Sequence, residues 1–217
     1  MRFSTASVLL AALICTAVSS PAAPSKQPPT VSHDGLQLTT SKNVDLLYLR
    51  EGATLAGYRQ VLLDPIQVAF DKQWSKERRD IDADERERIR NGLAEEFHKV
   101  FTEELQKNGG YQVVTAVGPD VLRVTAAIVD LYVTAPDINT PGRTRTYAVS
   151  SGHMTLIAEL RDAESGAILA RAADRREAMD NMTLQWTTRA SNTADARQIL
   201  KRWASVLRKG LDSARGA

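Results

Sequence analysis

The stretch "SSGH", residues 150–153, places two serines next to a histidine. Ser150 or Ser151 could act as a nucleophile, with His153 as its base and Asp130, on a preceding predicted strand, as the orienting acid. Such a triad would catalyse hydrolysis or acyl transfer. A triad is defined by geometry, however, and adjacent strand residues point to opposite faces, so this spacing assigns no catalytic residue.

Other patterns that support chemistry are missing from the sequence. The glycines of "NGG", 108–110, end a predicted helix and do not open one, so they offer no amides to a phosphate. The three histidines, His33, His98 and His153, lack metal-ligand spacing, and Cys15 is the single cysteine. We therefore expect no metal, no cofactor and no intrachain disulfide.

Two loop-like stretches combine arginine with aromatic residues, which are enriched where protein partners bind. They are "GRTRTY" and "LQWTTR", and they supply the candidate partner-binding residues Arg143, Arg145, Trp186 and Arg189. The alternative, which we favour, is that Trp186 packs on the sheet and the arginines are solvated. The dense charge run from Lys76 to Arg90 is typical of a solvated helix face.

The N-terminus has the layout of a secretory signal peptide. Arg2 precedes an apolar run over 8–18, and small residues follow, while eleven residues are too few for a membrane span, which needs about 20. The alternative is a short apolar helix that the mature protein retains. We expect a signal peptide over 1–19, a Pro/Ser/Ala-rich tether over 20–40 and one domain over 41–217, located in the periplasm.

Cys15 raises the alternative of an outer-membrane lipoprotein. Lipoprotein signals end at a cysteine that follows a small residue, whereas Ile14 precedes this one. We therefore expect Cys15 to leave with the signal peptide and the mature chain to start between Ser20 and Pro24. The mature protein would then contact a membrane only if Cys15 were lipidated.

Composition limits the classes of partner. The net charge is +2 and aromatic residues make up 6% of the chain, which argues against a nucleic-acid-binding surface. The hydrophobic share of 43% and the charged share of 25% are ordinary for a globular domain.

The spacing of apolar residues predicts strands grouped between two long helices. We expect strands over 58–65, 111–117 and 120–133, a hairpin around Gly166, and helices over 82–107 and 193–213. This order predicts an α+β fold: a mostly antiparallel sheet of four to five strands with two long helices packed on one face.

Particular residues fix these expectations. Asp82 should cap the first long helix, and Asp64-Pro65 should mark a sheet edge or a bulge rather than a catalytic aspartate. The apolar residues change face near Val129, which suggests a second bulge or a stretch covered on both sides. The buried helix stripes should be Ile89, Leu93, Phe97 and Phe101 in the first helix, and Ile199, Trp203, Val206, Leu207 and Leu211 in the last.

Several blocks, in their order along the chain, resemble one family. They are "GYRQVLLDPIQVAF", "GPDVLRVTAAIVDLYVTAPD", "MTLIAELRDAESGAILARAADRREA", "LQW" and "KRWASVLRKGLD". The chain is similar over roughly residues 35–215 to the bacterial envelope and lipoprotein family known as domain of unknown function 3313. The resemblance implies a secreted protein of Gram-negative bacteria and carries over no catalytic residue.

These observations favour an uncharacterised envelope protein that acts as a non-catalytic binding or assembly module. Its partner would be an unknown envelope protein or component. The alternative is a periplasmic hydrolase that acts on envelope material, which a deep polar cleft with a perturbed titratable pair would favour.

Overall fold

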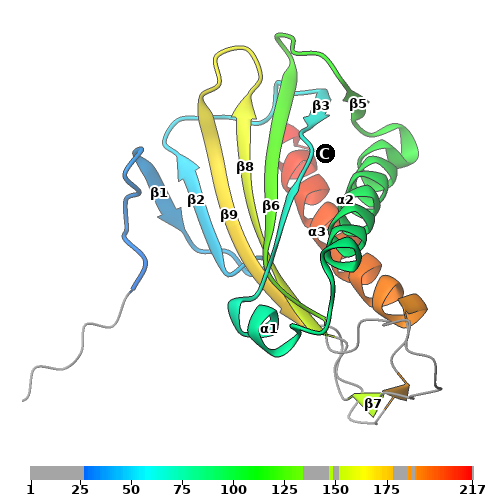
Figure 1. The fold of residues 1–217 in the computed structure, drawn as a ribbon. Helices are drawn as coiled ribbons and strands as arrows, with labels where there is room; N and C mark the ends of the chain where they lie inside the picture. The colour runs from blue at the N-terminus through cyan, green and yellow to red at the C-terminus, as the bar shows by residue number, and fades with distance from the viewer. Residues whose placement is uncertain (1–26, 134–146, 149–151, 178–184, 187–188, 217) are drawn as a thin grey trace, which may run out of the picture.

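The computed structural model describes residues 27–133, 147–148, 152–177, 185–186 and 189–216 (Figure 1). The elements, in chain order, are β1 (Leu36–Thr39), β2 (Leu46–Arg50), β3 (Gln60–Leu63), β4 (Gln67–Phe70), α1 (Lys72–Glu77), α2 (Ala83–Gln106), a single 3₁₀ turn η1 (Lys107–Gly109), β5 (Gln112–Val114), β6 (Val121–Val133), β7 (Tyr147–Ala148), β8 (Gly152–Asp162), β9 (Ile168–Glu177), β10 (Gln185–Trp186) and α3 (Arg189–Arg215).

An eight-stranded mixed sheet forms the centre of the fold. Its order is β1-β2-β9-β8-β6-β3-β5, and β4 also pairs with β6. The neighbouring pairs β1-β2, β2-β9, β9-β8 and β8-β6 are antiparallel. By contrast, β3 runs parallel to β5 and β6, and β4 runs parallel to β6. The expected α+β class is confirmed, but the expected sheet of four to five mostly antiparallel strands was too small. It omitted β1 and β2 and the parallel pairs that the α2 crossover creates.

The expected hairpin around Gly166 is present. β8 and β9 pair in antiparallel register from His153 with Glu177 to Arg161 with Ile168. Gly166 has a φ of 70°, a left-handed conformation that glycine adopts without a steric penalty.

Asp64-Pro65 forms a bulge between β3 and β4. Leu63 pairs with Val124 and Gln67 pairs with Ala127, so the chain advances four residues against three on β6. Proline has no N–H for the ladder, and the bulge removes the need for one. Both expected alternatives hold: β3 pairs with β5 only as far as Leu62, and β4 pairs only with β6 among the described strands, so the bulge lies at an edge of the sheet.

β6 contains the second expected bulge. Its register with β8 shifts between Val129 and Tyr132, and Asp130 has a φ of 53°. The extra residue restores the pattern of burial, so that Leu131 is buried in the same core as Ile128. The change of face in the sequence therefore reflects a bulge.

α2 and α3 lie side by side on one face of the sheet (Figure 1). The Asp82 side chain accepts a hydrogen bond of 2.7 Å from the Glu85 N–H and so caps α2, as expected. Leu93, Phe97 and Phe101 are buried, whereas Ile89 is only partly buried.

The N-terminal part of the described chain packs on the sheet. The Tyr48 hydroxyl donates a hydrogen bond of 2.9 Å to the Pro29 carbonyl, and Arg171 forms an ion pair of 2.7 Å with Asp34. β1 falls within 20–40, the range expected to be a tether, so the sheet starts before residue 41. Among the described residues, no helix has the length and hydropathy needed to cross a membrane.

Candidate functional site

The sheet is wider than the pair of helices that covers it. Figure 1 shows α2 and α3 near β3, β5 and β6, while β1 and β2 extend beyond them. Apolar side chains of the outer strands therefore face α3 across an opening. This opening, with a volume of about 530 Å³, is the candidate functional site, and we call it the α3 groove.

Both walls of the α3 groove are apolar. The residues that define it are Leu47, Leu49 and Leu169 on the strands and Val206, Leu207 and Gly210 on α3. Leu49 is 36% exposed, so the groove is open to solvent. Its volume lies within the range of roughly 300–1,000 Å³ that is usual for ligand sites.

The last helix was expected to bury five apolar residues. Ile199, Trp203 and Leu211 are buried in the core, as expected, whereas Val206 and Leu207 are only half-buried. None of the described elements covers these two residues, because they face the groove. Such an opening forms when the apolar stripe of a helix is wider than the neighbouring elements can cover.

Gly210 keeps the α3 groove open on the helix side. It is exposed, and a Cβ atom built at this position would meet nothing within 4 Å. Glycine within a helix costs about 1 kcal/mol relative to alanine. Its presence in α3 therefore lowers helix stability and gives the groove free space.

A buried polar network fixes α3 to β9 beside the groove. The Trp203 Nε1–H donates a hydrogen bond of 2.7 Å to Asp174, and the Asp45 N–H donates one of 3.1 Å to the same carboxylate. Arg176 pairs with Asp174 at 2.6 Å. The network joins α3, β9 and the segment before β2, and so sets the separation of the walls.

The charged side chains among the described lining residues are all positive. Among the described residues that line the groove, the charged ones are Arg50 and Lys209, and none is Asp, Glu or His. The Arg50 Nε–H donates to the Ile168 carbonyl, which orients the guanidinium group. The lining therefore offers apolar surface, hydroxyl groups and positive charge, and no acid–base pair.

The triad considered from the sequence is not assembled in the described residues. The His153 ring stacks on the Tyr132 ring, with centroids 5.1 Å apart, and Asp130 occupies the β6 bulge. Burial and the nearby Arg175 lower the pKa of His153. Ser150 and Ser151 lie outside the described residues.

Asp64 has a structural role. Its carboxylate accepts hydrogen bonds from Arg123 Nε at 2.9 Å and from the Thr125 hydroxyl at 2.7 Å. Both partners belong to β6, so Asp64 fastens the bulge to the sheet.

The partner-binding candidates are only partly described. Arg143 and Arg145 lie outside the described residues, Trp186 belongs to β10, which pairs with β7, and Arg189 is the first residue of α3. Their role stays a prediction, and so does the lipidation of Cys15, which also lies outside. Within the described ranges, no cluster of His, Cys, Asp and Glu could hold a metal ion.

Comparisons with solved structures give distant matches. Protein XCC0632 from Xanthomonas campestris is 11% identical, with 76% of this chain and 90% of that chain covered and a TM-score of 0.40. The PelC dodecamer from Paraburkholderia phytofirmans is 12% identical, with 75% and 96% covered and a TM-score of 0.37. A minor lipoprotein from Acinetobacter baumannii is 11% identical, with 73% and 95% covered and a TM-score of 0.29. At these values no property of the three is transferred to this chain.

No curated protein matches the chain. A family model, described as protein of unknown function (DUF3313), matches residues 26–207. This range includes every strand of the large sheet, α2 and most of α3, and it agrees with the resemblance found in the sequence blocks. The chain therefore belongs to the DUF3313 family.

Proposed function

We propose that this protein is an exported envelope protein that binds an apolar ligand in the α3 groove and performs no catalysis. The observation that carries the proposal is the groove itself, an opening of about 530 Å³ lined by leucine, valine and glycine. Exposed apolar surface of this kind marks binding sites in soluble proteins. The signal-peptide pattern at 1–19 supports export.

The lining of the groove favours binding over hydrolysis. Hydrolysis requires a nucleophile or activated water together with a general base. The serine and threonine residues of the lining have no histidine or carboxylate beside them among the described lining residues. The described lining can therefore hold a molecule but supplies no base that would act on it.

The test measures binding of Nile red, a fluorophore that brightens in apolar surroundings, to the purified exported protein. Gly210→Leu would fill the groove, because the new side chain has free space there. We expect the wild type to bind Nile red and Gly210→Leu to lose most of the signal.

Gly92→Leu is the matched control. Gly92 is also an exposed helical glycine whose Cβ would meet nothing within 4 Å, but it lies on α2 outside the groove. This variant should bind Nile red like the wild type. Equal binding by the wild type and both variants would show that the groove is not the site and would overturn the proposal.

A further inference from the structure

We propose that the occupant of the α3 groove is an anionic single-tailed amphiphile of the fatty-acid class, with its acidic head at Arg50 and Lys209. The inference rests on the proposed function, because it names the ligand of the same groove. It follows from the length of the groove, from its charged residues and from the paired backbone groups of the strands that line it.

The groove is elongated along α3. Its helix wall runs from Trp203 to Ala214, which corresponds to about 16 Å of helix. Aliphatic side chains face the opening along this wall, including Val206, Leu207 and Leu211. An extended hydrocarbon tail matches a long apolar surface, and each buried methylene contributes about 0.8 kcal/mol.

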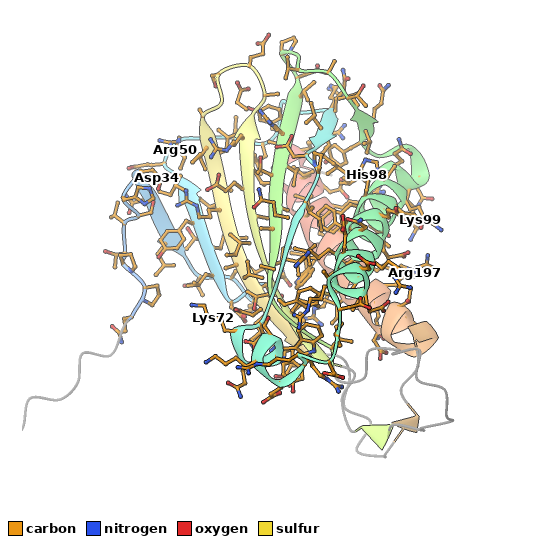
Figure 2. All side chains as sticks on the ribbon, viewed as in Figure 1. Asp34, Arg50, Lys72, His98, Lys99 and Arg197 are labelled. Carbon is orange, nitrogen blue, oxygen red and sulfur yellow. The ribbon has the colours of Figure 1, made fainter. Side chains whose placement is uncertain are left out.

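Two cations, Arg50 and Lys209, belong to the lining of the groove. Arg50 is the last residue of β2, and Lys209 lies about midway along the α3 wall of the groove; β2 and α3 end at the same end of the molecule (Figure 1). Figure 2 shows Arg50 at this end of the strands. A molecule whose tail lies on the apolar lining can therefore place an anionic head near a positive charge, because the charged residues among the described lining residues are Arg50 and Lys209.

These cations have no ion-pair partner among the described residues. Asp212, the nearest acid along α3, accepts a hydrogen bond of 3.0 Å from the Tyr111 hydroxyl and pairs with Arg208. Neither Tyr111 nor Asp212 lines the groove. An anionic head would supply the missing negative charge, and Arg50 suits a carboxylate because guanidinium binds carboxylates in a bidentate manner.

The backbone argues against an extended peptide as the occupant. β2, β9 and β8 each have a neighbouring strand on both sides in the sheet, so their N–H and C=O groups are already paired. A peptide added as a strand needs a free edge. An extended peptide in the groove would contact mainly aliphatic side chains and leave its own buried backbone groups unpaired, which is costly.

The test compares three ligands with the same hydrocarbon tail: laurate, the neutral dodecanol and the cationic dodecyltrimethylammonium. Each displaces Nile red from the wild-type protein at a pH at which laurate is ionised. We expect laurate to bind more tightly than dodecanol by roughly tenfold to a hundredfold, the effect of a charge-assisted hydrogen bond. The cationic ligand should bind most weakly.

Charge variants then locate the head. Lys209→Gln and the double variant Arg50→Gln/Lys209→Gln should lower laurate affinity stepwise toward that of dodecanol, while dodecanol affinity stays constant. Lys99→Gln is the matched control, because Lys99 is an exposed lysine on α2 away from the groove (Figure 2). It should leave all three affinities unchanged.

The outcomes separate the two proposals. If Nile red binding depends on Gly210 but laurate binds no better than dodecanol, the groove is a binding site and the anionic ligand class is wrong. Tighter binding of the cationic ligand, or a charge effect equal in Lys99→Gln, would also overturn the ligand class. If Gly210→Leu leaves Nile red binding intact, the proposed function itself fails.

Discussion

The indole Nε1–H of Trp203 donates a hydrogen bond of 2.7 Å to the Oδ2 atom of Asp174. Both side chains are buried, with 3% of Trp203 and 2% of Asp174 exposed. Trp203 belongs to α3 and Asp174 to β9, so this bond joins the two walls of the α3 groove. A buried carboxylate needs hydrogen-bond or ion-pair partners to offset the cost of its burial. Asp174 has two more partners, an ion pair with Arg176 and a hydrogen bond from the Asp45 N–H.

Asp174→Ala should destabilise the protein strongly. The substitution leaves the indole N–H of Trp203 unpaired in the core and removes the partner of Arg176, so we expect a loss of about 3–5 kcal/mol in the free energy of unfolding. Urea denaturation measures it. Asp80→Ala, at an exposed aspartate, is the control and should change stability by less than about 0.5 kcal/mol. Equal effects of the two variants would contradict the structural role of Asp174.

Gly210→Ala should stabilise the protein while it narrows the groove. Alanine is favoured over glycine inside a helix by about 1 kcal/mol, and the new methyl group meets no atom within 4 Å. Gly92→Ala should give a similar gain, because its surroundings are also empty. Thermal unfolding of both variants measures the effect, and a loss of stability in Gly210→Ala alone would show that the groove wall is more crowded than the structure indicates.

Phe97→Ala should remove a central part of the core. Phe97 is 2% exposed, and its ring stacks on that of Phe101 with centroids 3.9 Å apart. Truncation of a buried phenylalanine costs about 3–5 kcal/mol. His98→Ala, at the exposed neighbouring position, is the control. Chemical denaturation that gave both variants the same stability would exclude the observed packing of α2 on the sheet.

Local patterns predicted the parts of the fold that depend on near neighbours. The Asp82 cap, the hairpin at Gly166 and the bulge of β6 each follow from a few adjacent residues. β2 was missed because its sequence, LLYLR, does not alternate. Tyr48 is covered on one face by the segment at Pro29, and Leu47 and Leu49 face the groove on the other, so both faces carry apolar residues.

The candidate site was not predictable in the same way. The α3 groove depends on which strands extend beyond the helices, and this is a property of the strand order and not of any one segment. One signal in the sequence was the stripe that includes Val206 and Leu207, which was wide enough to indicate burial but could not show that none of the described elements covers these two residues. Gly210 in the same helix face is a second signal, because glycine costs about 1 kcal/mol relative to alanine inside a helix and leaves the space beside it free.

Export should remove the N-terminus. The apolar run over 8–18 and the small residues after it predict cleavage by a signal peptidase, with a mature chain that starts between Ser20 and Pro24. Intact-mass spectrometry of protein from the native host measures the start. A mature chain that began at Cys15 with added acyl mass would contradict this prediction and place the protein on a membrane leaflet, since the several chains of a lipoprotein give stable anchoring.

The stability of the fold should depend on pH through His153. Burial and the charge of Arg175 lower the pKa of His153 below its ordinary value of about 6.5. As the pH falls through that value, the unfolded chain takes up a proton before the folded one does. The free energy of unfolding should therefore decrease toward acid pH, until the pH is below the folded pKa as well.

His153→Gln removes this contribution, because glutamine does not titrate. Urea denaturation at about pH 7.5 and about pH 5.5, on either side of the ordinary pKa of histidine, measures the free energy of unfolding of both proteins. Between about pH 7.5 and about pH 5.5 the wild type should lose more of this free energy than the variant. Loss of the stacking on Tyr132 affects the variant equally at both values, so it cancels in the comparison. A difference that stayed constant with pH, or that moved in favour of the wild type in acid, would show that the folded protein does not disfavour the charged imidazole.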